Sequence, residues 1–206
     1  VLSAFIALFG VIFSAIYSEI SAYYKDRGLG MQKKWEVVFP IMKDYYNPWI
    51  HSANVFSRYL EDIKEYKTFS AEQASQILFY VSLFFTQRLR FSLKAGGRPI
   101  LAEDSDEVAV LEAYDAIEDA LNWTEREEER HEEVSFLQQT FERKDLPKRP
   151  YLAWRFVRDV EKNSKLKKIR DEVQTWLSRE HVERTKRALD NFELVFRKGM
   201  NKLYSG

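Results

Sequence analysis

Cysteine is absent from this chain, and glycine and proline are scarce. The 206 residues include no Cys, 7 Gly and 5 Pro. The lack of Cys excludes disulfides, thiolate nucleophiles, iron–sulfur clusters and Cys-ligated zinc. Strand-rich folds need many turns, so the scarcity of Gly and Pro favours long helices. With 31% charged and 45% apolar residues, the chain is neither disordered nor a multi-span membrane protein as a whole. We therefore expect an all-α fold.

Charge is missing from the opening segment. Residues 1–18 read VLSAFIALFGVIFSAIYS, and the first charged side chain is Glu19. At about 1.5 Å per residue, 18 helical residues extend about 27 Å, close to the hydrocarbon thickness of a bilayer. The segment has no polar stripe, unlike a core helix, and it continues as helix without the cleavage site of a signal peptide. The sequence predicts a single transmembrane helix at residues 1–24. The alternatives are a buried core helix and a cleavable signal peptide.

The flank of this span predicts how the body is oriented. Aromatic and basic side chains follow the apolar run, as expected where a helix leaves the bilayer: Tyr17, Tyr23, Tyr24, Lys25 and Arg27. Basic flanks stay on the cytoplasmic side. We therefore expect a cytoplasmic body, or a body on the matrix or stromal side if the protein is organellar.

Small residues recur along the predicted span at helical spacing. They are Ser3, Ala7, Gly10, Ser14, Ser18 and Ser21. Small side chains let helix backbones approach closely in lipid. The rows predict lateral packing, which implies a homo-oligomer or a place in a larger membrane complex, although such residues are common in any span.

The formal net charge is zero, but its distribution is uneven. Residues 25–100 carry a net charge of +5, residues 101–142 of −13, and residues 143–206 of +9. The simplest interpretation is that the basic C-terminal block pairs with the acidic segment of its own chain or of a second copy. Its mixture of cations and aromatics at 148–158 also leaves anionic lipid and nucleic acid open as partners.

Periodicity and capping signals divide the remainder into helices. We expect an anchor at 1–24, a helical bundle at 31–144 and a basic C-terminal helical segment at 151–206. The expected bundle helices are 31–46 with a kink at Pro40, 47–66 opening at Pro48, 70–95, 106–122 and 125–144. Their predicted caps are Ser70 with Gln73, Ser105, and Thr124 with Glu127.

Two further features concern the core and the C-terminal segment. The apolar run at 77–85 is too short to cross a bilayer, so we expect it in the central core helix. The C-terminal segment is expected to break near Asn163 and to end in a long helix. Residues 178–187 contain few apolar side chains, which predicts that this helix projects into water.

One spacing suggests chemistry. Arg126 and His131 stand in an R-x4-H arrangement, which resembles the motif of HEPN-type ribonucleases, all-helical proteins with a site at a dimer interface. The resemblance implies Arg126 as a phosphate binder, His131 as an acid/base and RNA as substrate. Six carboxylates between residues 125 and 133 would repel RNA phosphates. Glu128 and His131 form a single E-x-x-H pair, whereas di-metal bundles need two.

These observations favour assembly over catalysis. We expect a single-pass membrane-anchored helical assembly protein, without catalysis of its own and without a cofactor. It would be either a self-oligomerising scaffold or pore-like effector, or an accessory subunit of a membrane complex. The alternative is a HEPN-like RNA-binding or ribonuclease protein at the membrane.

Overall fold

The computed structural model describes residues 40, 42–95, 104–124, 126–142 and 153–205. This part of the chain contains seven α-helices and no strand, which confirms the all-α prediction. None of its helices is long and apolar enough to cross a membrane. The predicted span, its small-residue rows and its interface residues (Ser3 to Arg27) lie outside the described residues.

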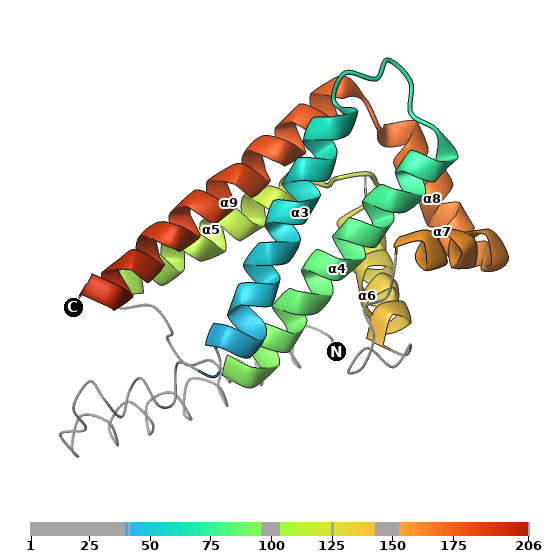
Figure 1. The fold of residues 1–206 in the computed structure, drawn as a ribbon. Coiled ribbons are helices and arrows are strands. Elements are labelled where there is room, and N and C mark those ends of the chain that lie inside the picture. Colours follow the sequence, from blue (N-terminus) through green and yellow to red (C-terminus); the bar gives the residue numbers. More distant parts are fainter. Residues whose placement is uncertain (1–39, 41, 96–103, 125, 143–152, 206) are drawn as a thin grey trace.

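The helices form two layers on either side of a central helix. In chain order they are a π-helical turn η1 (Met42–Tyr46), then α3 (Asn47–Ile63), α4 (Ala71–Ala95), α5 (Asp104–Ala120), α6 (Glu127–Glu142), α7 (Ala153–Lys162), α8 (Ser164–Trp176) and α9 (Arg179–Ser205). Helices α3, α5 and α9, with η1, pack together as the aromatic layer. Helices α6, α7 and α8 lie against the other side of α4 as the polar layer (Figure 1).

The central position of α4 follows from its hydrophobic run. The predicted core residues of segment 77–85 are buried, namely Ile77, Leu78, Phe79, Val81, Phe84 and Phe85. A helix that is apolar on several sides must be covered on several sides. Helix α4 accordingly packs against α3 and η1 on one side and against α6, α7 and α8 on the other.

Two helix starts agree with the sequence analysis. The Ser70 amide donates to Gln73 Oε1 at 2.8 Å, and the Gln73 amide donates to Ser70 Oγ at 3.2 Å, which is the predicted capping box. Asn163 Oδ1 accepts from the amides of Lys165 and Leu166 at 3.0 and 3.1 Å. This cap begins α8 and confirms the predicted break.

Other boundaries differ from the expectation. Ser105 lies inside α5, which includes Asp104. The Thr124 hydroxyl accepts a hydrogen bond from the Arg126 amide at 3.2 Å. In the predicted capping box it would accept from the Glu127 amide instead. Helix α6 begins at Glu127. A second break at Leu177 and Ser178 was not predicted. There Ser178 Oγ accepts from the His181 amide at 3.2 Å and starts α9.

The expectation that the last helix projects from the body was wrong. Helix α9 packs along both α3 and α5. Three polar links join it to α3: Asn54 to Glu193 at 2.7 Å, Ser57 to Asp190 at 2.5 Å, and Lys186 to Glu61 at 3.5 Å. Residue numbers rise along one helix as they fall along the other, so the two helices are antiparallel. The charged run predicted to be solvated therefore includes the partly buried Lys186, which pairs with Glu61 of α3.

Helices α5 and α9 pack side by side, and Ala113 and Ala120 of α5 are buried. The Arg184 guanidinium and the Thr185 hydroxyl donate to the Ala120 carbonyl at 3.2 and 3.3 Å, which turns that edge of α5 toward α9. Ala116, Ala113 and Ala109 continue the same edge at steps of four, three and four residues. Arg184 thus meets the negative end of the α5 dipole, so the basic segment contacts the acidic one partly through backbone carbonyls.

Candidate docking cleft

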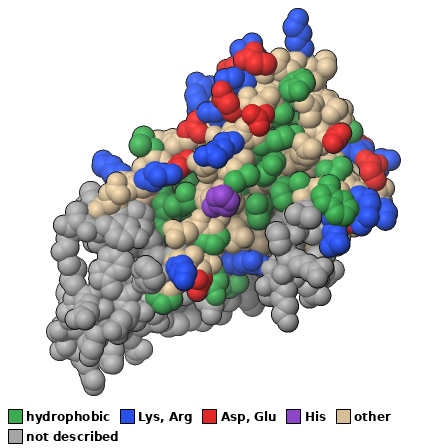
Figure 2. All heavy atoms as spheres, viewed as in Figure 1, with side chains coloured by type: hydrophobic (Ala, Val, Ile, Leu, Met, Phe, Trp, Pro, Cys, Tyr) green, Lys and Arg blue, Asp and Glu red, His purple; other side chains and the backbone are tan. Residues whose placement is uncertain are grey.

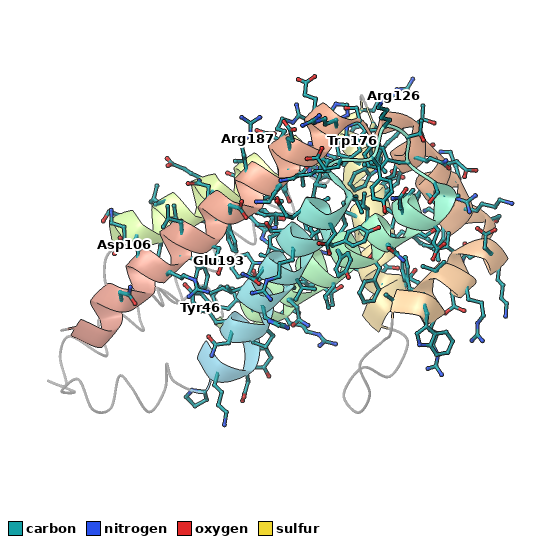
Figure 3. All side chains as sticks on the ribbon, turned by 45° about the horizontal axis from the view of Figure 1, so that its top comes forward. Tyr46, Asp106, Arg126, Trp176, Arg187 and Glu193 are labelled. Atoms are coloured by element: carbon teal, nitrogen blue, oxygen red, sulfur yellow. The ribbon has the colours of Figure 1, made fainter. Side chains whose placement is uncertain are left out.

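An open cleft of about 800 Å³ lies between the α5–α6 connection and one face of α8. Its lining residues are Asn122, Trp123, Thr124, Ser164, Lys167, Lys168, Asp171, Glu172, Thr175 and Trp176. Figure 3 shows Trp176 at the same end of the molecule as Arg126 and far from Tyr46. The lining residues come from α8 and from the connection that precedes α6, so the cleft belongs to the polar layer.

Helical periodicity explains why α8 presents these residues together. Steps of three and four residues separate Ser164, Lys168, Glu172 and Thr175, which places them on one side of a helix. The buried residues Leu166, Ile169 and Val173 follow the same period on the adjacent side. One side of α8 thus packs on α4, while its neighbour faces the cleft.

Trp123 is held rigidly in the opposite wall. Its side chain is 7% exposed, and its Nε1 donates to Glu133 Oε2 at 2.8 Å. Burial raises the pKa of the Glu133 carboxyl, the Trp123 hydrogen bond lowers it, and hydrogen bonding and like charge from Glu172 raise it again. The buried acid of α6 and the cleft acid of α8 are therefore electrostatically linked.

Three of the four charged side chains that line the cleft, Lys168, Asp171 and Glu172, form ion pairs. Lys168 Nζ lies 3.1 Å from Glu172 Oε1. Asp171 Oδ1 accepts from Nη2 of the buried Arg170 at 2.6 Å, and Arg170 also pairs with Glu161 of α7. The lining thus holds two lysines and two carboxylates, which sum to zero net charge, beside the rings of Trp123 and Trp176.

Ser178 and His181 resemble a nucleophile–base pair, but their hydrogen bonds argue against that role. His181 Nδ1 lies 3.0 Å from Ser178 Oγ and 2.5 Å from the Trp176 carbonyl oxygen. A carbonyl oxygen can only accept, so Nδ1 carries the hydrogen. The serine hydroxyl thus faces a donor and not a base. The arrangement instead fixes His181 flat against Trp176, with ring centroids 4.6 Å apart and planes 12° apart.

Trp176 leaves one polar atom unsatisfied. Its Nε1 is buried and has no hydrogen-bond partner among the described residues. An indole N–H is a donor only, and a buried donor without an acceptor costs about 1–3 kcal/mol.

Comparisons of the chain with protein-family models, with curated proteins and with solved structures gave no match. The interpretation of the cleft therefore depends on its own geometry.

The R-x4-H residues lie outside the cleft. Arg126 is exposed and its Nη1 pairs with Glu129 Oε1 at 3.0 Å, while His131 is exposed on α6. Arg126 precedes α6, which begins at Glu127, so the two residues do not share a helix. Their catalytic role stays a prediction. No group of three His, Asp or Glu residues in the described part of the chain could hold a metal ion.

Sequence reasoning did not find the cleft. Neither Trp123 nor Trp176 was among the predicted site residues. The signal that could have indicated the cleft is a tryptophan between two helices, where an amphipathic ring often marks a boundary between core and solvent.

Proposed function

We propose that this chain is a membrane-anchored assembly protein whose helical body binds a segment of a partner protein in the Trp123–Trp176 cleft. Residues 1–24 would tether the body to the bilayer. The partner is a second copy of the chain or another subunit of a membrane complex. In either case the protein acts by holding its partner at the membrane.

The two tryptophans that line the cleft, Trp123 and Trp176, carry this proposal. Tryptophan is enriched among the residues that dominate protein–protein binding energy, because its ring offers a large apolar surface. The cleft volume of about 800 Å³ can admit several side chains, and its paired charges reduce the desolvation cost of covering it.

The mass of the particle tests the proposal. The chain weighs 24.5 kDa, and we expect the full chain, extracted in a mild detergent, to give a protein mass well above that value. Multiples of the chain mass would identify a homo-oligomer, and a second band on a denaturing gel would identify a different subunit. A particle of one chain alone would contradict the proposal.

A pair of matched substitutions connects that mass to the cleft. Thr175→Arg places a long side chain at an exposed cleft position, and we expect it to shift the particle toward the single chain. Asn191→Arg makes the same addition at an exposed position of α9, away from the cleft, and should leave the mass unchanged. Equal masses for both variants and the wild type would mean that assembly does not use the cleft.

A further inference from the structure

Helix α7 has an outer face that nothing in the described structure covers. Its inner residues Phe156 and Val160 are fully buried, whereas Trp154 is 57% exposed. A fold normally places a tryptophan where most of its ring is covered. An indole left in water at the start of a strongly amphipathic helix is unusual and points to a contact outside the chain.

Cations surround this indole. Arg155, Arg158 and Lys162 are all exposed on α7. The guanidinium carbons of Arg155 and Arg158 lie 5.8 and 5.4 Å from the centre of the Trp154 ring. We call these four residues the Trp154 patch. Figure 2 shows Lys and Arg side chains gathered beside hydrophobic ones at the edge of the molecule where Figure 1 places α7.

The acidic residues of α7 do not cancel the patch. Glu161 is paired with the buried Arg170 of α8. Asp159 is half-buried and engaged in a contact of its own. Farther along the chain, the exposed Lys165 and Lys167 extend the basic character onto α8, and Lys165 Nζ lies 4.4 Å from the Phe136 ring centre. The exposed cations therefore remain available to an anionic surface.

We propose that the Trp154 patch binds the anionic phospholipid headgroups of a membrane surface. Tryptophan prefers the headgroup region, because its ring is apolar and its N–H needs a polar partner. Guanidinium groups bind phosphate with two parallel hydrogen bonds, and basic side chains near an anionic leaflet add attraction. A short amphipathic helix with this composition lies flat on the surface. The patch would give the body a second membrane contact, independent of the span and of the cleft.

RNA fits the same residues less well. Proteins that bind single-stranded nucleic acid stack several successive bases on aromatic rings along a basic groove. Helix α7 offers one exposed ring on a helix of 10 residues. A planar, laterally extended array of phosphates matches this short face better than a single strand does.

Fluorescence quenching by lipid tests the proposal on the full chain. The protein is reconstituted into vesicles of phosphatidylcholine alone or of phosphatidylcholine mixed with phosphatidylserine, with brominated phosphatidylcholine as the quencher in both. Subtracting the signal of Trp154→Phe isolates Trp154 among the 5 tryptophans. We expect Trp154 to be quenched in the anionic vesicles and not in the neutral ones. Equal quenching, or none, in both vesicle types would overturn the proposal.

Charge reversal separates a headgroup site from simple proximity to the bilayer. Arg155→Glu with Arg158→Glu should abolish the anion-dependent quenching, while Arg187→Glu with Lys198→Glu, two exposed cations of α9, should leave it intact. Circular dichroism checks that both variants keep the helical content of the wild type. Tight binding of labelled single-stranded RNA that the first variant loses, with lipid quenching unchanged, would also overturn the proposal.

Discussion

The two layers of the bundle are stabilised in different ways. In the aromatic layer, rings pack on rings: the Trp49 ring centre lies 4.9 Å from that of Phe192 and 5.4 Å from that of Phe91. In the polar layer, apolar residues such as Phe156 and Ile169 are buried too, but charged groups add hydrogen bonds: Arg170 of α8 to Glu161 of α7, and Trp123 to Glu133 of α6. The first arrangement favours rigidity, and the second leaves surfaces that a partner can use.

The two layers also differ in how their buried polar atoms are hydrogen-bonded. The Trp49 indole N–H is buried without a partner among the described residues, and dense aromatic packing must offset that cost. The cleft, the Trp154 patch and the linked acids Glu133 and Glu172 all lie in or against the polar layer. Both proposed binding surfaces thus lie on the side of α4 opposite the aromatic layer.

Removing a ring from the aromatic layer should have the largest effect on stability. Phe192 is fully buried and contacts the rings of Trp49, Phe84 and Phe196. We expect Phe192→Ala to lower the free energy of unfolding by about 3–5 kcal/mol, because it creates a cavity and removes aromatic contacts. Urea titration followed by circular dichroism measures this change.

The matched control for this prediction lies two residues away. Leu194 is 67% exposed on the same helix, so Leu194→Ala should change the free energy of unfolding by no more than about 0.5 kcal/mol. If the two variants were equally stable, the aromatic layer would not be the main source of stability.

Removing the charged link of the polar layer should have an intermediate and more local effect. Arg170 is 5% exposed, while its partners Glu161 and Asp171 are exposed and can return to water. We expect Arg170→Ala to cost about 2 kcal/mol through lost packing and lost charge-assisted hydrogen bonds. Amide hydrogen exchange should accelerate in α7 and α8 before the aromatic layer.

Arg170→Met tests which part of that loss comes from packing. Methionine keeps much of the volume of the arginine stem without its hydrogen bonds. We expect Arg170→Met to be more stable than Arg170→Ala and less stable than the wild type. Amide exchange that accelerates equally in both layers would show that the layers do not open separately.

The smallest effect should concern pH. Burial raises the pKa of Glu133, so the folded chain holds this proton more strongly than the unfolded chain does. The stability from this proton is complete below the ordinary carboxyl pKa and is lost as pH rises through the raised pKa. The groups that face it are Glu172, Lys168 and Trp123.

Glu133→Gln removes this titration and retains an oxygen that can accept from Trp123. We expect the variant to be more stable than the wild type at neutral pH, by about 1 kcal/mol, with the advantage disappearing in acid. Melting temperatures of the wild type and the variant, measured from acid to neutral pH, test this prediction. A wild type that gains stability relative to the variant as pH rises would contradict the assigned direction.

Local signals in the sequence predicted much of the fold. The capping box at Ser70 and Gln73 and the cap at Asn163 depend on hydrogen bonds within four residues, so they can be recognised without tertiary contacts. The apolar run in α4 similarly indicated the centre of the core. The break at Ser178 was missed because the preceding apolar row and the following charged run both have helical character.

The sequence by itself determined the helical class, the central place of α4 and several helix ends, since these follow from side-chain periodicity and local hydrogen bonding. It also predicts the membrane span at residues 1–24, which lies outside the described residues. Only the tertiary structure decided that α9 is a core helix, because its charged residues pair with polar groups of α3 that are distant in sequence. The same holds for the cleft, because Trp123 of the α5–α6 connection and Trp176 of α8 are 53 positions apart in the sequence and line it together.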